Sequence, residues 1–221
     1  MTVKEAVRSR HSVRQYQNKP ISAEHAEKLQ KLIEEYNAEG NLHFQLIQNE
    51  PRAFDSLLAH YGKFTNVKNY IALIGRKSPD LEELCGYFGE KLVIEAQQMG
   101  LHTCWVGGTF SRVPEAFHLQ ADEKLVCIIA VGYGENQGVP HKSKPPETVV
   151  KTEGSLPEWF IRGVKCAMLA PTALNQQKFS FAVDGNKVTA KAGLGFFTKI
   201  DLGIVKYHFE VGAGKENFEW K

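Results

Sequence analysis

Long apolar runs and an excess of either charge are missing from this sequence. The longest apolar run, residues 125–131, is far too short to span a bilayer. The 27 basic and 25 acidic side chains leave a net charge of +2, which gives no electrostatic footprint for nucleic acid or an anionic membrane. We therefore expect neither of these as a partner, and any anionic ligand must be met by a local basic cluster.

Targeting signals and metal-binding motifs are also missing. The N-terminus is charged and lacks the apolar stretch of a secretory signal. The eight histidines include no HExxH motif, and the cysteines form no CxxC pair. The cysteines are Cys85, Cys104, Cys127 and Cys166. This pattern predicts a reduced, cytoplasmic protein with core thiols and no metal site.

The composition that is present is ordinary for a globular protein. Hydrophobic residues make up 43% of the 221 residues and charged residues 24%. A chain of this length can bury a proper core, either as one large domain or as two small ones. Disorder as the main state is therefore excluded.

Hydrophobic periodicity and end signals predict a chain that mixes helices with strands. Thr2 and Glu5 form a potential capping box for a short first helix, and Ser22 precedes a helix that Gly40 ends. Further helices are expected at 80–98, 158–169 and 201–214. Strands are expected at 42–47, 70–75, 101–108, 125–134, 179–183, 187–193 and 216–220, with a helix and then a loop at 54–67.

The first motif with chemical content is RSRHSVR, residues 8–14. Three arginines, a histidine and two serines in seven residues supply several charge-assisted donors within one turn, which suits a phosphate or an oxygen-rich ring edge. A solvated basic surface turn explains the same composition.

The second motif is CWVGG, in which the strand expected at 101–108 ends in two glycines. Glycines leave backbone N–H groups unscreened, so an aromatic ligand can approach closely. A bulge or a tight turn explains the pair equally well. Farther along, Lys142 and Lys144 lie on a proline-rich loop, where they suit a phosphate clamp or are simply solvated.

The third motif is APTALNQQKF, residues 170–179. A proline and small residues followed by Asn175 and Gln177 describe a turn edged with amide groups, which both donate and accept hydrogen bonds. Such a turn can lie against a heteroaromatic ring, although turn chemistry alone favours a plain connection from helix to strand. Residues 24–41 and 158–175 share a coarse helix-then-loop plan, which suggests two similar halves.

Together, RSRHSVR, CWVGG, GYG followed by HKSKPPETVV, and APTALNQQKFSF resemble the FMN-dependent nitroreductase family across nearly the whole chain. The resemblance implies an α+β, nitroreductase-like fold with a central, mostly antiparallel sheet flanked by helices. It also implies that FMN contacts the matching residues. These are Arg10, His11, Ser12, Arg14, Val106, Gly107, Gly108, Lys142, Lys144, Pro171, Thr172, Ala173, Asn175 and Gln177.

The order of the motifs departs from the family pattern. In the typical homodimer, the A-P-S-x-x-N-x-Q stretch follows R-x-S-x-R closely and reaches the flavin bound mainly by the other subunit. Here it starts 160 residues after Arg10, at Ala170. This order resembles the duplicated, divergent, TM nitroreductase-like branch, in which one chain acts as a pseudo-dimer. It predicts a first half at 1–150, a second half at 151–221, and one FMN per chain, with assembly into a homo-oligomer left open.

The expected function is that of an FMN-dependent NAD(P)H oxidoreductase. The flavin carries the chemistry, NADH or NADPH reduces it in a ping-pong cycle, and a nitroaromatic, quinone or similar small oxidant accepts the electrons. No catalytic side chain is expected, although Tyr61 and Lys63 are candidates for the entrance of the site. The alternative is a flavin-binding, flavin-storage or redox-sensing protein without efficient turnover of NAD(P)H.

Overall fold

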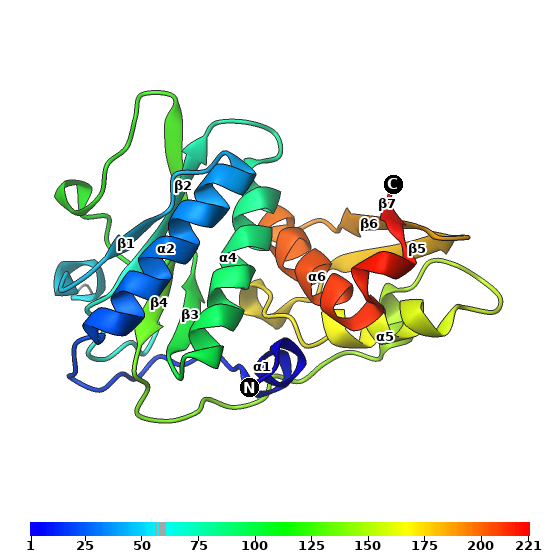
Figure 1. Ribbon diagram of the computed structural model, residues 1–221, viewed down its shortest axis with the longest axis horizontal. Coiled ribbons are helices and arrows are strands. Elements are labelled where there is room, and N and C mark those ends of the chain that lie inside the picture. Colours follow the sequence, from blue (N-terminus) through cyan, green and yellow to red (C-terminus); the bar gives the residue numbers. More distant parts are fainter. Residues whose placement is uncertain (56, 58–60) are drawn as a thin grey trace. The chain divides into compact units, whose positions relative to one another are not determined.

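The computed structural model describes residues 1–55, 57 and 61–221 (Figure 1). By their internal contacts these residues form two compact units. The N-terminal unit comprises residues 10–81 and 91–140, and the C-terminal unit comprises residues 1–9, 82–90 and 141–221. This grouping describes where internal contacts are dense; the division into two halves after residue 150, expected from the resemblance, stays a prediction.

The N-terminal unit is built on a four-stranded antiparallel sheet with the strand order β1-β2-β4-β3. The two central strands are almost entirely buried because both faces of the sheet are covered. The ladder between them shifts register once, between Leu73 and Ile74. The strands are β1 (Gln45–Ile47), β2 (Tyr70–Arg76), β3 (His102–Val106) and β4 (Glu123–Gly132).

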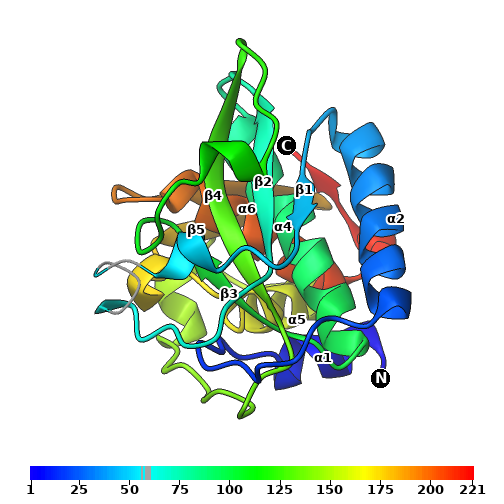
Figure 2. The same cartoon turned by 90° about the vertical axis from the view of Figure 1, so that its left-hand side faces the viewer.

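Helix α2 (Ala23–Gly40) lies along one side of this sheet, as both views show (Figures 1 and 2). Its predicted start is confirmed, because the Ser22 side chain accepts a hydrogen bond from the His25 backbone N–H at 3.2 Å. Its apolar stripe includes Leu29 and Ile33, both of which are buried. Helix α4 (Leu81–Gln98) contributes Leu81 and residues 91–98 to this unit and residues 82–90 to the other.

The C-terminal unit packs helices α5 (Glu158–Ala167) and α6 (Thr198–Ala213) with a three-stranded sheet in the order β5-β6-β7. The predicted hairpin is confirmed: β5 (Phe179–Asp184) pairs antiparallel with β6 (Lys187–Ala192), and β7 (Glu219–Trp220) then pairs parallel with β6. Stacked and edge-on aromatic rings fill the core. They include Phe160, Phe181, Phe209, Phe218 and Trp220.

Two glycines allow α6 to touch the first half of α4. A Cβ at Gly203 would overlap the carbonyl oxygen of Glu83, and a Cβ at Gly86 would overlap that of Ile200. The helix backbones therefore meet without side chains between them. The capping box predicted for α1 (Val3–Ser9) also forms, with Thr2 and Glu5 exchanging two hydrogen bonds.

The described part of the chain also contains short 3₁₀ turns. They are η1 (Pro51–Phe54), η2 (Pro114–Ala116), η3 (Pro146–Val149), η4 (Ala173–Asn175) and η5 (Lys215–Asn217). The helix and loop expected at 54–67 fall partly on residues 56 and 58–60, which lie outside the described residues. Across the described part of the chain, no helix combines the length and apolar character needed to cross a membrane.

Candidate functional site

Residues 10–14 run beside the edge strand of the N-terminal sheet. The backbone N–H of Val13 donates to the carbonyl of Thr103 at 3.0 Å, and Ser12 forms a parallel bridge with the same residue. Val13 is 1% exposed and anchors the segment in the core, while Arg14 is exposed. The Arg10 side chain is 3% exposed. The fold therefore lays the arginine-rich segment along β3.

The buried thiol of Cys104 shows how closely these side chains converge. Burial raises the pKa of the thiol, while the charge of Arg14, a hydrogen bond with Ser12 and the charge of Arg10 act to lower it. Three of the predicted flavin ligands therefore surround one point on β3. Their cationic groups make this edge of the sheet electropositive, as an anionic ligand requires.

The loop that follows β4 covers residues 10–14 from outside. Gly138 adopts a positive φ of 71°, and a Cβ there would lie 2.8 Å from the Cβ of His11 and 3.0 Å from the carbonyl oxygen of Ser12. The N–H of Gly134 donates to Nδ1 of His102 at 3.1 Å, which fixes the start of this loop on β3. The position of His11 and Ser12 thus depends on a close backbone approach that only glycine permits.

At the other end of β3, the two predicted glycines are open to ligands. Val106 is 2% exposed and closes the strand, whereas Gly107 and Gly108 are exposed. A Cβ built on Gly108 has no neighbour within 4 Å. The backbone here is therefore accessible to a flat molecule, which fits the requirement of a flavin ring. Residues 12 and 13 thus pair with the start of β3, and the two glycines follow its end, all within one unit.

The other predicted residues belong to the C-terminal unit, where two loops are hydrogen-bonded to each other. Nδ2 of Asn175 and Nε2 of Gln177 both donate to the carbonyl of Lys142, at 2.8 and 2.9 Å. The N–H of Lys144 donates to Oε1 of Gln177 at 2.8 Å, and Nζ of Lys144 donates to the carbonyl of Gln176 at 2.8 Å. The amide edge predicted from the sequence thus holds the lysine loop.

The turn itself has an unusual backbone. Leu174, Asn175 and Gln177 have φ angles of 52°, 51° and 47°, in the left-handed region that residues other than glycine rarely adopt. The Leu174 side chain is 96% exposed, whereas Pro171, Thr172 and Ala173 are half-buried. Such a conformation persists only where the surrounding structure imposes it.

Asp201, near the start of α6, imposes much of it. Its carboxylate accepts the N–H of Ala173 at 2.9 Å and Nε2 of Gln176 at 2.8 Å. The residue is 2% exposed, and burial raises the pKa of its carboxyl to about 6 against the two hydrogen bonds, which lower it. Sequence reasoning missed this residue. The available signal was an acidic side chain in the first turn of a helix, followed directly by the apolar run from Leu202 to Val205.

Tyr61 and Lys63, the predicted entrance residues, lie at the surface. Tyr61 is 86% exposed, and Lys63 is exposed with a φ of 60°. Neither side chain is held against residues 10–14 or the two glycines by a described hydrogen bond or ion pair. The entrance role stays a prediction.

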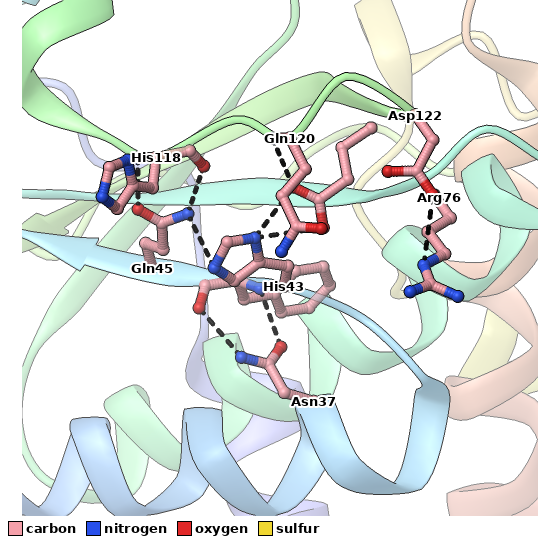
Figure 3. A network of polar contacts seen from close by, with 9 residues as sticks. Asn37, His43, Gln45, Arg76, His118, Gln120 and Asp122 are labelled. Atoms are coloured by element: carbon pink, nitrogen blue, oxygen red, sulfur yellow. Dashed lines mark hydrogen bonds and ion pairs between the residues drawn. The ribbon is translucent and has the colours of Figure 1, made fainter.

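A separate polar network joins α2, β1 and the segment before β4 (Figure 3). Nδ1 of His43 lies 2.9 Å from Oε2 of Glu123, which also accepts the N–H of Gln120 at 3.0 Å. Burial raises the pKa of the Glu123 carboxyl, but the hydrogen bonds and the charge of His43 outweigh burial and leave it lowered. None of the predicted flavin ligands belongs to this network, which we interpret as structural.

Comparison with known proteins points to one family. The family model described as "Putative TM nitroreductase" matches residues 2–213, nearly the whole chain. A search among curated protein sequences finds no match.

Solved structures share the fold. A "putative nitroreductase" from Thermotoga maritima has a TM-score of 0.70 and 23% identity, and the match covers 98% of this chain and 85% of that chain. A "putative nitroreductase in complex with FMN" from Desulfovibrio desulfuricans has a TM-score of 0.53 and 20% identity, over 71% of this chain and 99% of that chain. A "putative NADH dehydrogenase/NAD(P)H nitroreductase" from Parabacteroides distasonis has a TM-score of 0.54 and 20% identity, and the match covers 69% of this chain and 98% of that chain.

Proposed function

The chain belongs to the family described as "Putative TM nitroreductase", and we propose that it is an FMN-dependent oxidoreductase that takes electrons from NAD(P)H. One observation carries the proposal: residues 10–14 lie along β3, the strand that ends in the exposed Gly107 and Gly108. Cationic side chains and accessible backbone thus occur in one unit. Both are needed to hold a flat, phosphate-bearing cofactor.

Each residue has a role that its surroundings support. Arg10 and Arg14 supply positive charge beside Ser12 and His11, which suits the phosphate and the oxygen-rich edge of the flavin. Val106, Gly107 and Gly108 present backbone amides to the ring, because no side chain of the two glycines screens them. When bound, FMN accepts a hydride from NAD(P)H and passes the electrons to a second substrate such as a nitroaromatic or quinone.

The resemblance further predicts that Lys142, Lys144 and residues 171–177 bind the same flavin, so that one chain acts as a pseudo-dimer with one FMN. The coupling between the two loops supports treating these residues as a group. Flavin released by denaturation and counted against protein tests the stoichiometry. A ratio of two per chain contradicts the prediction.

Flavin titration of variants tests the site. Arg10→Ala and the exposed Arg14→Ala should each weaken FMN binding by about 1.5 to 3 kcal/mol, the value of a charged hydrogen bond. Arg76→Ala removes an exposed arginine paired with Asp122 and serves as the matched control. If all three variants bind FMN as the wild type does, residues 10–14 do not hold the flavin.

Lys142→Met and Asn175→Ala separate a direct contact from a structural one. Lys142→Met keeps the backbone carbonyl that accepts both amides and removes only the exposed ammonium group. It should weaken FMN binding while the free energy of unfolding stays unchanged. If only Asn175→Ala has an effect, and that effect is a lower melting temperature, then the loop is structural.

Turnover is tested by anaerobic mixing of the flavin-loaded protein with NADH or NADPH. Bleaching of the flavin absorbance, followed by recovery on addition of a quinone, is expected. A spectrum that does not change identifies the protein as a flavin binder or sensor.

A further inference from the structure

The N-terminal unit contains a polar cavity of about 180 Å³ that includes none of the residues assigned to flavin. Its lining comes from separate segments of the chain: residues 16–20, Asn49, then Asn66, Lys68 and Asn69, and finally Val131 and Gly132 at the end of β4. Since a water molecule takes up about 30 Å³ of liquid, the cavity has room for roughly six waters or for one small polyatomic ion.

A lysine side chain links two of the segments that line the cavity. Nζ of Lys68 donates to Oδ1 of Asn18 at 2.7 Å. This hydrogen bond joins the segments that carry Lys68 and Asn18, and it uses one of the three ammonium hydrogens. Lys19 contributes a second ammonium group at the rim, 4.4 Å from the centre of the Tyr133 ring. The cavity therefore has two cations with donor capacity to spare.

Asn69 provides a donor to which no described residue is hydrogen-bonded. The residue is 5% exposed and lines the cavity. Its Oδ1 accepts the N–H of Asn49 at 3.2 Å, and its backbone carbonyl accepts the N–H of Val131 at 3.1 Å. Among the described residues, none accepts a hydrogen bond from its Nδ2 group. Because Asn69 lines the cavity, this donor is available there to a ligand or water that accepts a hydrogen bond.

Acidic groups do not oppose an anion at this cavity. The described residues that line it include two lysines and no carboxylate. The neighbouring Glu50 is engaged elsewhere, because its carboxylate pairs with Arg52 at 2.6 and 2.9 Å. The local field is therefore positive, and every identified free donor suits an oxyanion.

We propose that this cavity binds a phosphate group, with Lys68 and Asn69 donating to its oxygens from the walls and Lys19 adding charge at the rim. The volume accommodates inorganic phosphate with part of its hydration shell. It also accommodates the phosphate of a small phosphomonoester whose remainder extends to solvent.

Titration calorimetry tests the proposal on protein saturated with FMN, in a phosphate-free buffer at constant ionic strength. Because FMN then occupies the flavin site, the added phosphate cannot bind there and contribute to the measured heat. Inorganic phosphate and glycerol phosphate are titrated separately, with acetate as a carboxylate of similar size. Tighter binding of glycerol phosphate identifies a phosphomonoester as the ligand, and equal binding identifies free phosphate. Binding of acetate as tight as that of phosphate contradicts the proposal.

Two variants locate the binding. Lys68→Met removes one charge-assisted donor and should weaken phosphate binding about tenfold to hundredfold. Asn69→Asp keeps the acceptor for Asn49, replaces the free donor with a carboxylate and should weaken binding at least as much. Lys28→Met removes an exposed lysine on α2 and should change nothing. The proposal is wrong if wild type gives no saturable signal at millimolar phosphate, or if folded Asn69→Asp binds phosphate like wild type.

Discussion

Replacing Asp201 with asparagine should remove a pH dependence from the free energy of unfolding. The carboxyl is 2% exposed, and burial raises its pKa from an ordinary 3.8 to about 6. The native state therefore binds a proton more tightly than the unfolded chain between these two values. Stability from this group is fully present below pH 3.8 and is lost as the pH rises through 6.

The size of the effect follows from the same values. A tenfold change in proton affinity is worth about 1.36 kcal/mol, so a rise from 3.8 to about 6 corresponds to about 3 kcal/mol. Asparagine keeps a carbonyl oxygen for the N–H of Ala173 but turns an amide nitrogen toward Nε2 of Gln176, two donors facing each other. That loss is independent of pH between 4 and 8. The lost hydrogen bond therefore lowers the free energy of unfolding of the variant by the same amount at every pH, and the slope of that free energy against pH is unaffected.

The assay is urea unfolding of wild type and Asp201→Asn at several values between pH 4 and pH 8. The stability of the variant relative to wild type should rise by about 2.4 kcal/mol across this range, mostly between pH 4 and pH 6, because part of the total of about 3 kcal/mol is already lost by pH 4. Asp184→Asn, at an exposed position in the β5–β6 turn, provides the control. Its free energy of unfolding should differ from that of wild type by the same amount at every pH. If the difference in free energy of unfolding between Asp201→Asn and wild type is also independent of pH, the carboxyl titrates normally and the argument from burial is refuted.

Three further changes test other parts of the structure. Gly203→Ala should destabilise the protein by about 3 kcal/mol in urea unfolding, because the new Cβ overlaps the carbonyl of Glu83 and neither helix backbone can yield easily. Gly108→Ala should leave stability within about 0.5 kcal/mol of wild type, since its Cβ meets open space, while FMN titration shows weaker binding. His43→Gln should move acid unfolding, followed by circular dichroism, to higher pH. The pKa of Glu123 is held low partly by His43, so its stabilisation is present above the ordinary value of 4.5 and is lost as the pH falls. An unchanged acid midpoint would count against this role of His43.

Elements with local end signals were predictable from the sequence. Helix α2 begins after its Ser22 cap, and Asn41 ends it in the left-handed conformation directly after Gly40, the residue expected to stop it. The capping box of Thr2 and Glu5 forms as the spacing indicates. In these cases the deciding hydrogen bonds join residues within one turn of the chain.

The first strand shows why other elements were not predictable. Alternation indicated a strand at 42–47, but β1 spans only Gln45–Ile47. Residues 42 and 43 still contact β2, through the hydrogen bond from the N–H of His43 to the carbonyl of Ile74 at 2.9 Å and the bridge between Leu42 and Gly75. Between them and β1, the side chain of Asn37 accepts the N–H of Phe44 at 2.7 Å and donates to its carbonyl at 3.0 Å (Figure 3). A side chain on α2 thus satisfies the backbone groups of Phe44 in place of a further strand. Hydrophobic alternation carries no information about such a competitor.

The same limit applies to the turn at residues 173–177, whose amide groups were expected to face a ligand. Their direction is set by Asp201 and by the carbonyl of Lys142, both about 30 residues away in sequence. Three residues in the left-handed region would not hold this shape unaided, but hydrogen bonds from two directions fix it. A loop fixed in this way is preorganised, and little conformational freedom is left to lose on binding. The amides thus support the proposed flavin site by positioning Lys142 and Lys144, a role that the motif alone does not reveal.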